Sequence, residues 1–132
     1  MTTQTQQQAP ASWSGSLPEF LVHQELERQG KISGVDFIYQ SSRMGGRMQK
    51  GGVILDFLFS NPPDLAINVQ GIYYHYEFGT ETKARDLIAL QQLAGDGITL
   101  IFIDEDDALS NARYIVREAL AYRDHSQISR GV

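Results

Sequence analysis

The chain contains no cysteine among its 132 residues. This absence excludes a disulfide-stabilised scaffold, a cysteine-ligated zinc or iron–sulfur site and a thiol nucleophile. The sequence also has no apolar run of about 18 residues, the length typical of a membrane-spanning helix. Its first residues lack the basic start and apolar stretch of a signal peptide. We therefore expect a single cytoplasmic domain that has no membrane segment and is long enough to bury a core.

Positive charge is also scarce, because 11 Lys and Arg residues stand against 16 Asp and Glu residues, for a formal net charge of −5. This balance argues against a general electrostatic attraction to nucleic acid. The stretch from Phe37 to Leu55 is an exception, since it holds no acid and three cations: Arg43, Arg47 and Lys50. Their place on a glycine-containing loop predicts contacts with phosphate groups, and the alternative is an ordinary solvated loop.

The two ends of the chain differ in composition from its middle. Residues 1–15 carry no charged side chain and are rich in Gln and Thr. This composition is typical of a flexible tail that a protein partner or a second copy of the chain would order. Residues 124–132 form a second, polar tail. We therefore place one domain at residues 16–123.

Apolar periodicity and turn residues predict the order helix, three strands, helix, strand, helix. The helices are expected at residues 16–29, 80–94 and 108–123, and the strands at 35–39, 53–59, 65–69 and 98–103. Ser16 and Glu19 match a capping box at the start of the first helix. The second and third strands are too apolar for a sheet with one face in water, so we expect helices on both faces.

This order predicts a mixed α/β sheet flanked by helices. The first three strands would form an antiparallel meander, and the fourth would lie parallel to the third after a crossover through the helix at 80–94. On that helix, the residues expected to form the buried stripe are Ala84, Leu87, Ile88 and Gln91.

Asp56 is the most informative residue, because it lies within an otherwise apolar strand. A carboxylate there is costly to desolvate unless it is paired, bound to metal or at an open strand edge. The next strand ends near Gly71, and His75 follows it closely enough to share a cleft with Asp56. A carboxylate, a main-chain carbonyl and an imidazole together suit Mg²⁺ binding and activation of a water for phosphodiester hydrolysis.

Both residues also have simpler interpretations. Asp56 at a strand end would pair with one of the three cations of the preceding loop, and His75 would be a half-buried histidine between tyrosines. Tyr73 and Tyr74 would stack on DNA bases under the first interpretation, and would be core or rim residues under the second. The acidic run Asp104–Asp107 lacks the glycine and spacing of a calcium loop, so Asp106 or Asp107 is expected to cap the last helix.

The order of elements, with Gly-Gly-Val-Ile-Leu-Asp-Phe at 51–57 and Gly-Ile-Tyr-Tyr-His at 71–75, resembles the PD-(D/E)XK nuclease-like superfamily. Within that superfamily it is most similar to the very-short-patch-repair endonucleases and their short bacterial and phage relatives. The resemblance covers about residues 16–122. It implies a restriction-endonuclease-like fold and a DNA endonuclease or resolvase-like activity that depends on Mg²⁺ or Mn²⁺.

The resemblance also implies roles for particular residues. Asp56 would bind the metal together with the main-chain carbonyl of Val69, and His75 would assist the attacking water. Glu19 is the best match to an acid that the first helix often contributes, and Glu25 is the second match.

The chain departs from the family where an acid, a spacer and a lysine are usual. Asn68 stands at the acid position and Gln70 at the lysine position, where Gln70 would contact the scissile phosphate or the water. These departures support an alternative in which the fold persists without its chemistry. The domain would then be a binding or assembly module, in a phage particle or in a larger DNA-processing complex.

Overall fold

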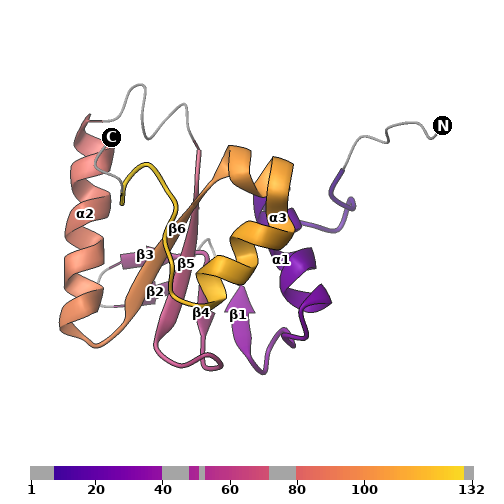
Figure 1. Cartoon of the computed structure of the whole chain (residues 1–132), viewed down its shortest axis with the longest axis horizontal. Coiled ribbons are helices and arrows are strands. Elements are labelled where there is room, and N and C mark those ends of the chain that lie inside the picture. The colour runs from indigo at the N-terminus through magenta and orange to yellow at the C-terminus, as the bar shows by residue number, and fades with distance from the viewer. Residues whose placement is uncertain (1–7, 40–47, 51–52, 72–79, 130–132) are drawn as a thin grey trace.

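The computed structural model describes residues 8–39, 48–50, 53–71 and 80–129. These residues form three layers, with a central sheet between α2 on one face and α1 and α3 on the other (Figure 1). The elements in chain order are α1 (Leu17–Arg28), β1 (Phe37–Tyr39), β2 (Met48–Lys50), β3 (Val53–Leu55), β4 (Phe57–Phe59), β5 (Leu65–Gln70), α2 (Thr80–Gly95), β6 (Thr99–Asp104) and α3 (Glu105–Leu120). None of the helices in the described ranges is long and apolar enough to cross a membrane.

The main sheet has the strand order β1-β4-β5-β6. The pairs β1–β4 and β4–β5 are antiparallel, and β5 and β6 are parallel and connected through α2. The mixed sheet, the meander and the crossover through α2 were predicted from the sequence and are confirmed. The predicted element order is not reproduced in detail, because the region expected to be one strand at 53–59 is divided and an additional strand, β2, precedes it.

The division falls at Asp56. Before it, β3 pairs with β2 in a separate two-stranded ribbon, and after it β4 joins the main sheet. The Asp56 carboxylate accepts a hydrogen bond of 2.9 Å from the main-chain N–H of Val69. The main-chain N–H of Asp56 donates to the side-chain oxygen of Asn68 at 2.7 Å. Side-chain hydrogen bonds therefore replace the ladder at this point, and the chain bends.

Two apolar clusters hold the layers together. One lies between the sheet and the pair α1 and α3, and includes Val22, Phe57 and Val116. The other lies between the opposite face of the sheet and α2, and includes Ala66, Leu93 and Phe102. The expectation that helices cover both faces is thus confirmed. Alternate residues of β5 face opposite clusters, as the two-residue period of a strand requires.

The start of α1 matches the predicted capping box. The Ser16 hydroxyl accepts from the N–H of Glu19 at 3.2 Å, and the Glu19 carboxylate accepts from the N–H of Ser16 at 3.4 Å. Just before this helix, the Trp13 ring stacks on Tyr39 with 4.6 Å between ring centroids. Its indole N–H donates to the Ser16 carbonyl at 3.1 Å. Trp13 lies in the predicted N-terminal tail, and it packs against the domain.

The buried face of α2 is not the predicted one. The residues expected to be buried, Ala84, Leu87, Ile88 and Gln91, are exposed. The side that meets the sheet carries Ala89, Leu90 and Leu93. The prediction was wrong because apolar residues occur on both sides of this helix, so its periodicity alone does not select a face.

The C-terminal segment 124–129 is packed against β6. Ile128 is 3% exposed and belongs to the cluster under α2. Asp124 accepts from the main-chain N–H of Phe102 at 2.8 Å, and Asp104 accepts from the N–H of Gln127 at 3.0 Å. This part of the predicted polar tail is therefore fixed to the domain by hydrogen bonds to the last strand.

Glu118 at the end of α3 supports the start of this segment. Its carboxylate accepts two hydrogen bonds from Arg123, of 2.8 and 2.9 Å, and lies 2.9 Å from Nε2 of His125. The hydrogen bonds from Arg123, and then that from His125, lower the pKa of Glu118 from 4.5 to about 2.

Replacing Phe57 with Ala should lower the free energy of unfolding by about 3–5 kcal/mol, because it removes a fully buried aromatic ring from the core. Urea denaturation measures this change. Ile38→Ala on β1, where the side chain is 46% exposed, is the control and should cost much less. Equal losses in the two variants would contradict the placement of Phe57 in a packed core.

Stability should also depend on pH through Glu118. Because the pKa of Glu118 in the folded protein lies below its ordinary value, its contribution is complete above pH 4.5 and is lost as the pH falls towards about 2. Urea denaturation of the wild type and Glu118→Gln across this range should show their difference in free energy of unfolding decreasing with falling pH. A difference that stays constant between these pH values would refute the assignment.

Candidate functional site

Several predicted site residues meet at one end of the main sheet. Gln70 and Asp104 are the last residues of the parallel strands β5 and β6, and they are paired in the strand register. Asp56 lies at the same end, because it precedes β4, which runs antiparallel to β5. In α/β proteins, ligands commonly bind at the carboxyl ends of parallel strands. We take this end of the sheet as the candidate site.

Asp56 is 1% exposed, so its carboxylate is removed from bulk water. Burial of a carboxylate is costly unless hydrogen bonds or a cation compensate for the lost hydration. The bond from the Val69 N–H is one compensating interaction. In an antiparallel pair, a residue directs its N–H and its C=O towards the same neighbour. The Val69 carbonyl is therefore expected on the side of β5 that faces Asp56.

Asn68 has a structural role at the position where the resemblance to the PD-(D/E)XK superfamily predicts an acid. Its side-chain oxygen accepts the N–H of Asp56 at 2.7 Å, which fixes the bend between β3 and β4. A carboxylate here would place a second negative charge beside that of Asp56. The amide supplies the acceptor without adding this charge.

Gln70 is 3% exposed and lies on the face of β5 that α2 covers. Its amide nitrogen donates to the carboxylate of Asp86 on α2 at 3.0 Å. Asp86 precedes Ala89, Leu90 and Leu93 by three, four and seven positions, so all four share the inward stripe of the helix. The helix that covers Gln70 therefore brings a carboxylate to its side chain.

Glu19 reaches this end of the sheet from the opposite face. It is 6% exposed and accepts a hydrogen bond of 2.6 Å from the Tyr39 hydroxyl. Tyr39 pairs with Phe57, the residue after Asp56. Glu25, the second match, lies farther along α1, where it accepts from Gln29 at 3.0 Å. Of the two, Glu19 is the acid on the side of the candidate site.

The remaining predicted residues lie outside the part of the chain that the structure describes. They are His75, Tyr73, Tyr74, Arg43 and Arg47. Lys50 ends β2, and only its backbone is described. The proposed roles of these residues in catalysis and DNA contact therefore stay predictions.

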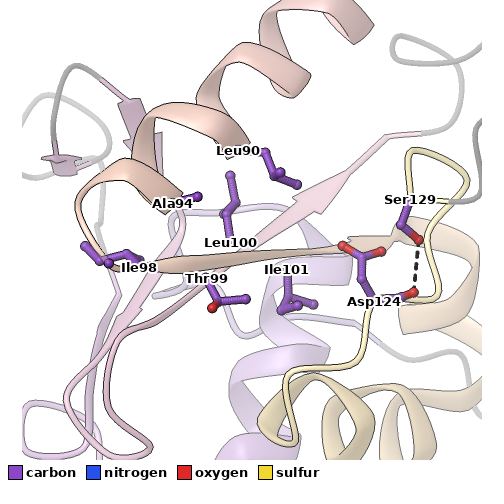
Figure 2. A pocket seen from close by; sticks show the side chains of 9 residues that line it. Leu90, Ala94, Ile98, Thr99, Leu100, Ile101, Asp124 and Ser129 are labelled. Atoms are coloured by element: carbon purple, nitrogen blue, oxygen red, sulfur yellow. Dashed lines mark hydrogen bonds between the residues drawn. The ribbon is translucent and has the colours of Figure 1, made fainter.

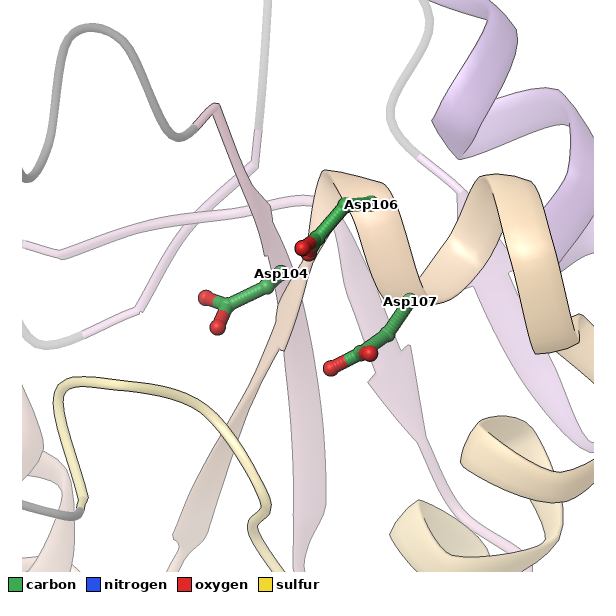
Figure 3. Close-up of side chains that lie close together, drawn as sticks. All are labelled: Asp104, Asp106 and Asp107. Atoms are coloured by element: carbon green, nitrogen blue, oxygen red, sulfur yellow. The ribbon is translucent and has the colours of Figure 1, made fainter.

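An acidic cluster lies beside Asp104 at the junction of β6 and α3. The carboxylates of Asp104, Asp106 and Asp107 have oxygen atoms within 4.8 Å of one another (Figure 3). The helix begins at Glu105, and its cap residue is Asp104, which makes no side-chain cap hydrogen bond. The prediction that Asp106 or Asp107 caps this helix was therefore wrong. Acids in a first turn complement the helix dipole, so this cluster has a structural explanation without a cation.

A pocket of about 440 Å³ lies between α2, the start of β6 and the C-terminal segment (Figure 2). Ile98 and Thr99 line it, so it lies near the opposite end of β6 from Asp104. Its walls are mainly apolar. The Ser129 hydroxyl donates to the main-chain carbonyl of Asp124 at 3.0 Å, and the Asp124 carboxylate accepts the Phe102 N–H. These polar groups thus have structural partners, and the pocket is separate from the candidate site.

Sequence reasoning missed Asp86. Its contact with Gln70 depends on which face of α2 meets the sheet, and the apolar pattern predicted the other face. The sequence does place Asp86 three positions before Ala89 and seven before Leu93, a spacing that puts all three residues on one face of the helix. This spacing indicates the contact only weakly, because a charged residue is rarely found on the buried face of a helix.

Asn68→Ala should lower the free energy of unfolding by about 1–3 kcal/mol, because the N–H of the buried Asp56 would lose its acceptor. Thermal or urea denaturation measures the change. Gln92→Ala on the exposed side of α2 is the matched control and should be nearly neutral. If both variants are equally stable, the bond between Asn68 and Asp56 does not support the bend.

Comparisons with protein-family models, with curated proteins and with solved structures found no match to this chain.

Proposed function

We propose that this protein is a metal-dependent nuclease that hydrolyses phosphodiester bonds in DNA, as an endonuclease or a resolvase-like enzyme. The observation that carries the proposal is the buried Asp56 carboxylate at the break between β3 and β4, held against the main chain of Val69. Protein cores rarely retain such a group without a partner or a function. Its position at the carboxyl end of β5 supports a functional use.

The available donor atoms fit Mg²⁺ or Mn²⁺. Asp56 offers a carboxylate, and the main-chain carbonyl of Val69 is expected on the same side of β5. Mg²⁺ prefers oxygen ligands and is often held by one or two carboxylates, with water and substrate phosphate completing its coordination. A single buried carboxylate is therefore sufficient for a site that is completed by the substrate. Such an ion would neutralise phosphate charge and lower the pKa of a bound water.

The residues of the chain would then act on that water and on the phosphate. Hydrolysis forms a bond from the water oxygen to phosphorus and breaks one P–O ester bond, and the leaving oxygen takes up a proton. His75 is proposed to accept the proton of the attacking water. Gln70 is proposed to contact the water or the phosphate, and Glu19 to complete the acidic surroundings from α1.

DNA is the proposed substrate because a local excess of positive charge precedes Asp56. Arg43, Arg47 and Lys50 occur in a stretch without acids, and the last of them ends β2. The ribbon of β2 and β3 places Met48 opposite Leu55, the residue before Asp56. The three cations are proposed to hold the phosphate backbone, with Tyr73 and Tyr74 stacking on bases.

A catalytically inactive binding or assembly module is the second candidate. The observation that favours it is the role of Asn68, whose side chain stabilises the bend in place of contributing a second charge to a metal site. Under this proposal the domain would act through a protein partner or through a second copy of the chain. Light scattering after size-exclusion chromatography should then show an oligomer or a complex.

The nuclease proposal predicts that the protein cuts DNA in the presence of Mg²⁺ or Mn²⁺. Plain, mismatched and branched duplexes should be compared by gel electrophoresis, with EDTA to remove the metal. Asp56→Asn should reduce cleavage by at least about 100-fold, because it removes the charge that binds the ion. Mn²⁺ should also raise the melting temperature of the wild type, and this increase should disappear in Asp56→Asn.

Asp96→Asn is the matched control, because Asp96 is exposed in the turn before β6, at the other end of the sheet. It should cut DNA and respond to Mn²⁺ as the wild type does. Metal-dependent cleavage that persists in Asp56→Asn would refute the proposed site. No cleavage and no response to Mn²⁺ in the wild type would favour the inactive module.

A further inference from the structure

The hydrogen bond between Gln70 and Asp86 decides which end of the Gln70 amide can serve the candidate site. The amide nitrogen donates to the Asp86 carboxylate at 3.0 Å. A carboxylate accepts hydrogen bonds and does not donate them, so it selects the nitrogen of the amide and turns the oxygen away. Within the described part of the chain, the amide oxygen of Gln70 makes no hydrogen bond.

We infer that Asp86 is a positioning residue of the site, which holds Gln70 so that its amide oxygen acts as an acceptor towards the attacking water or the metal. This inference rests on the proposed function. It assigns Gln70 a role different from that of the lysine usual at this position, since a lysine can only donate. It also excludes Gln70 as the main phosphate contact, because the negative charge of Asp86 lies beside its only donor group.

Three observations support this role for Asp86. Gln70 is 3% exposed, so its amide has little access to bulk water that would compensate for a lost partner. Asp86 lies on the inward stripe of α2 with Leu90 and Leu93, so packing of the helix against the sheet fixes the carboxylate in place. Hydrogen bonds to charged acceptors are also about twice as strong as neutral ones, so the amide orientation is well defined.

The Gln70 side chain also has a second acidic neighbour, on the adjacent strand β6. Asp104 is its partner in the register of β5 and β6, and Asp104 is 1% exposed. Phe102, two residues earlier on β6, belongs to the cluster under α2, so Asp104 lies on the same face as Gln70. The Gln70 side chain is therefore surrounded by β5, β6 and α2, and this packing restricts its amide to one orientation.

The test is a double-mutant cycle between positions 70 and 86, measured with the metal and the DNA that the wild type cuts. Asp86→Ala should lower kcat about 10–100-fold, the usual effect of losing a group that orients a ligand. The KM for DNA should not change, because the substrate does not touch Asp86. Asp86→Asn keeps a neutral acceptor and should recover part of kcat. Alanine is the best helix former, so α2 should persist.

The cycle is completed by Gln70→Ala and the double variant. If Asp86 acts only through Gln70, Asp86→Ala should have no further effect on kcat in the Gln70→Ala background. Gln92→Ala on the exposed side of the same helix is the control and should match the wild type. Independent effects of the two substitutions, or an Asp86→Ala variant as active as the wild type, would overturn the inference.

A second measurement does not depend on turnover. The side-chain NH₂ signals of Gln70 in ¹⁵N-labelled protein should shift in Asp86→Ala, and Mn²⁺ should broaden them in the wild type. If the Gln70 NH₂ signals do not shift in Asp86→Ala, the positioning role is overturned, even in an active enzyme. If the wild type neither cuts DNA nor shows any Mn²⁺ effect near Asp56, the proposed function fails and the role of Asp86 fails with it.

Discussion

The burial of one carboxylate, that of Asp56, governs how the middle of this chain folds. Its charge can be kept away from water only where hydrogen-bond donors or a cation compensate for the lost hydration, and the N–H of Val69 is one such donor. Accepting that bond ends the ladder between β4 and β5 and separates β3, which pairs with β2 instead. The sheet end, the bend and the candidate site are thus consequences of the same interaction.

The packing of α2 follows a related constraint. Its inward stripe combines Leu90 and Leu93 with the half-buried carboxylate of Asp86, which accepts a hydrogen bond from the Gln70 amide. Leu87 and Ile88 lie on the other side, with 40% and 55% of their surfaces exposed. The orientation of α2 against the sheet therefore forms the hydrogen bond between Gln70 and Asp86, and it leaves the side chains of Leu87 and Ile88 in water.

Local signals predicted a large part of the fold. The capping box at Ser16, the meander and the parallel crossover followed from short patterns of capping residues, β-formers and turns. The break at Asp56 and the face of α2 were not predictable in this way, because both depend on partners far along the chain. In the candidate site, Asp56 was recognised because a carboxylate in an apolar strand is unusual. Asp86 was missed, since an acid in a helix is ordinary until its neighbour is known.

The segment 124–129 has a consequence for association between chains. β6 is the last strand of the main sheet, and an uncovered edge strand is a template onto which a strand of another molecule can add. Here the Asp124 carboxylate accepts a hydrogen bond from the main-chain N–H of Phe102, and the Asp104 carboxylate, two residues farther along β6, accepts one from the N–H of Gln127. An incoming strand would have to displace a charged group that is already bound. The segment 124–129 thus protects this edge against growth of the sheet into aggregates.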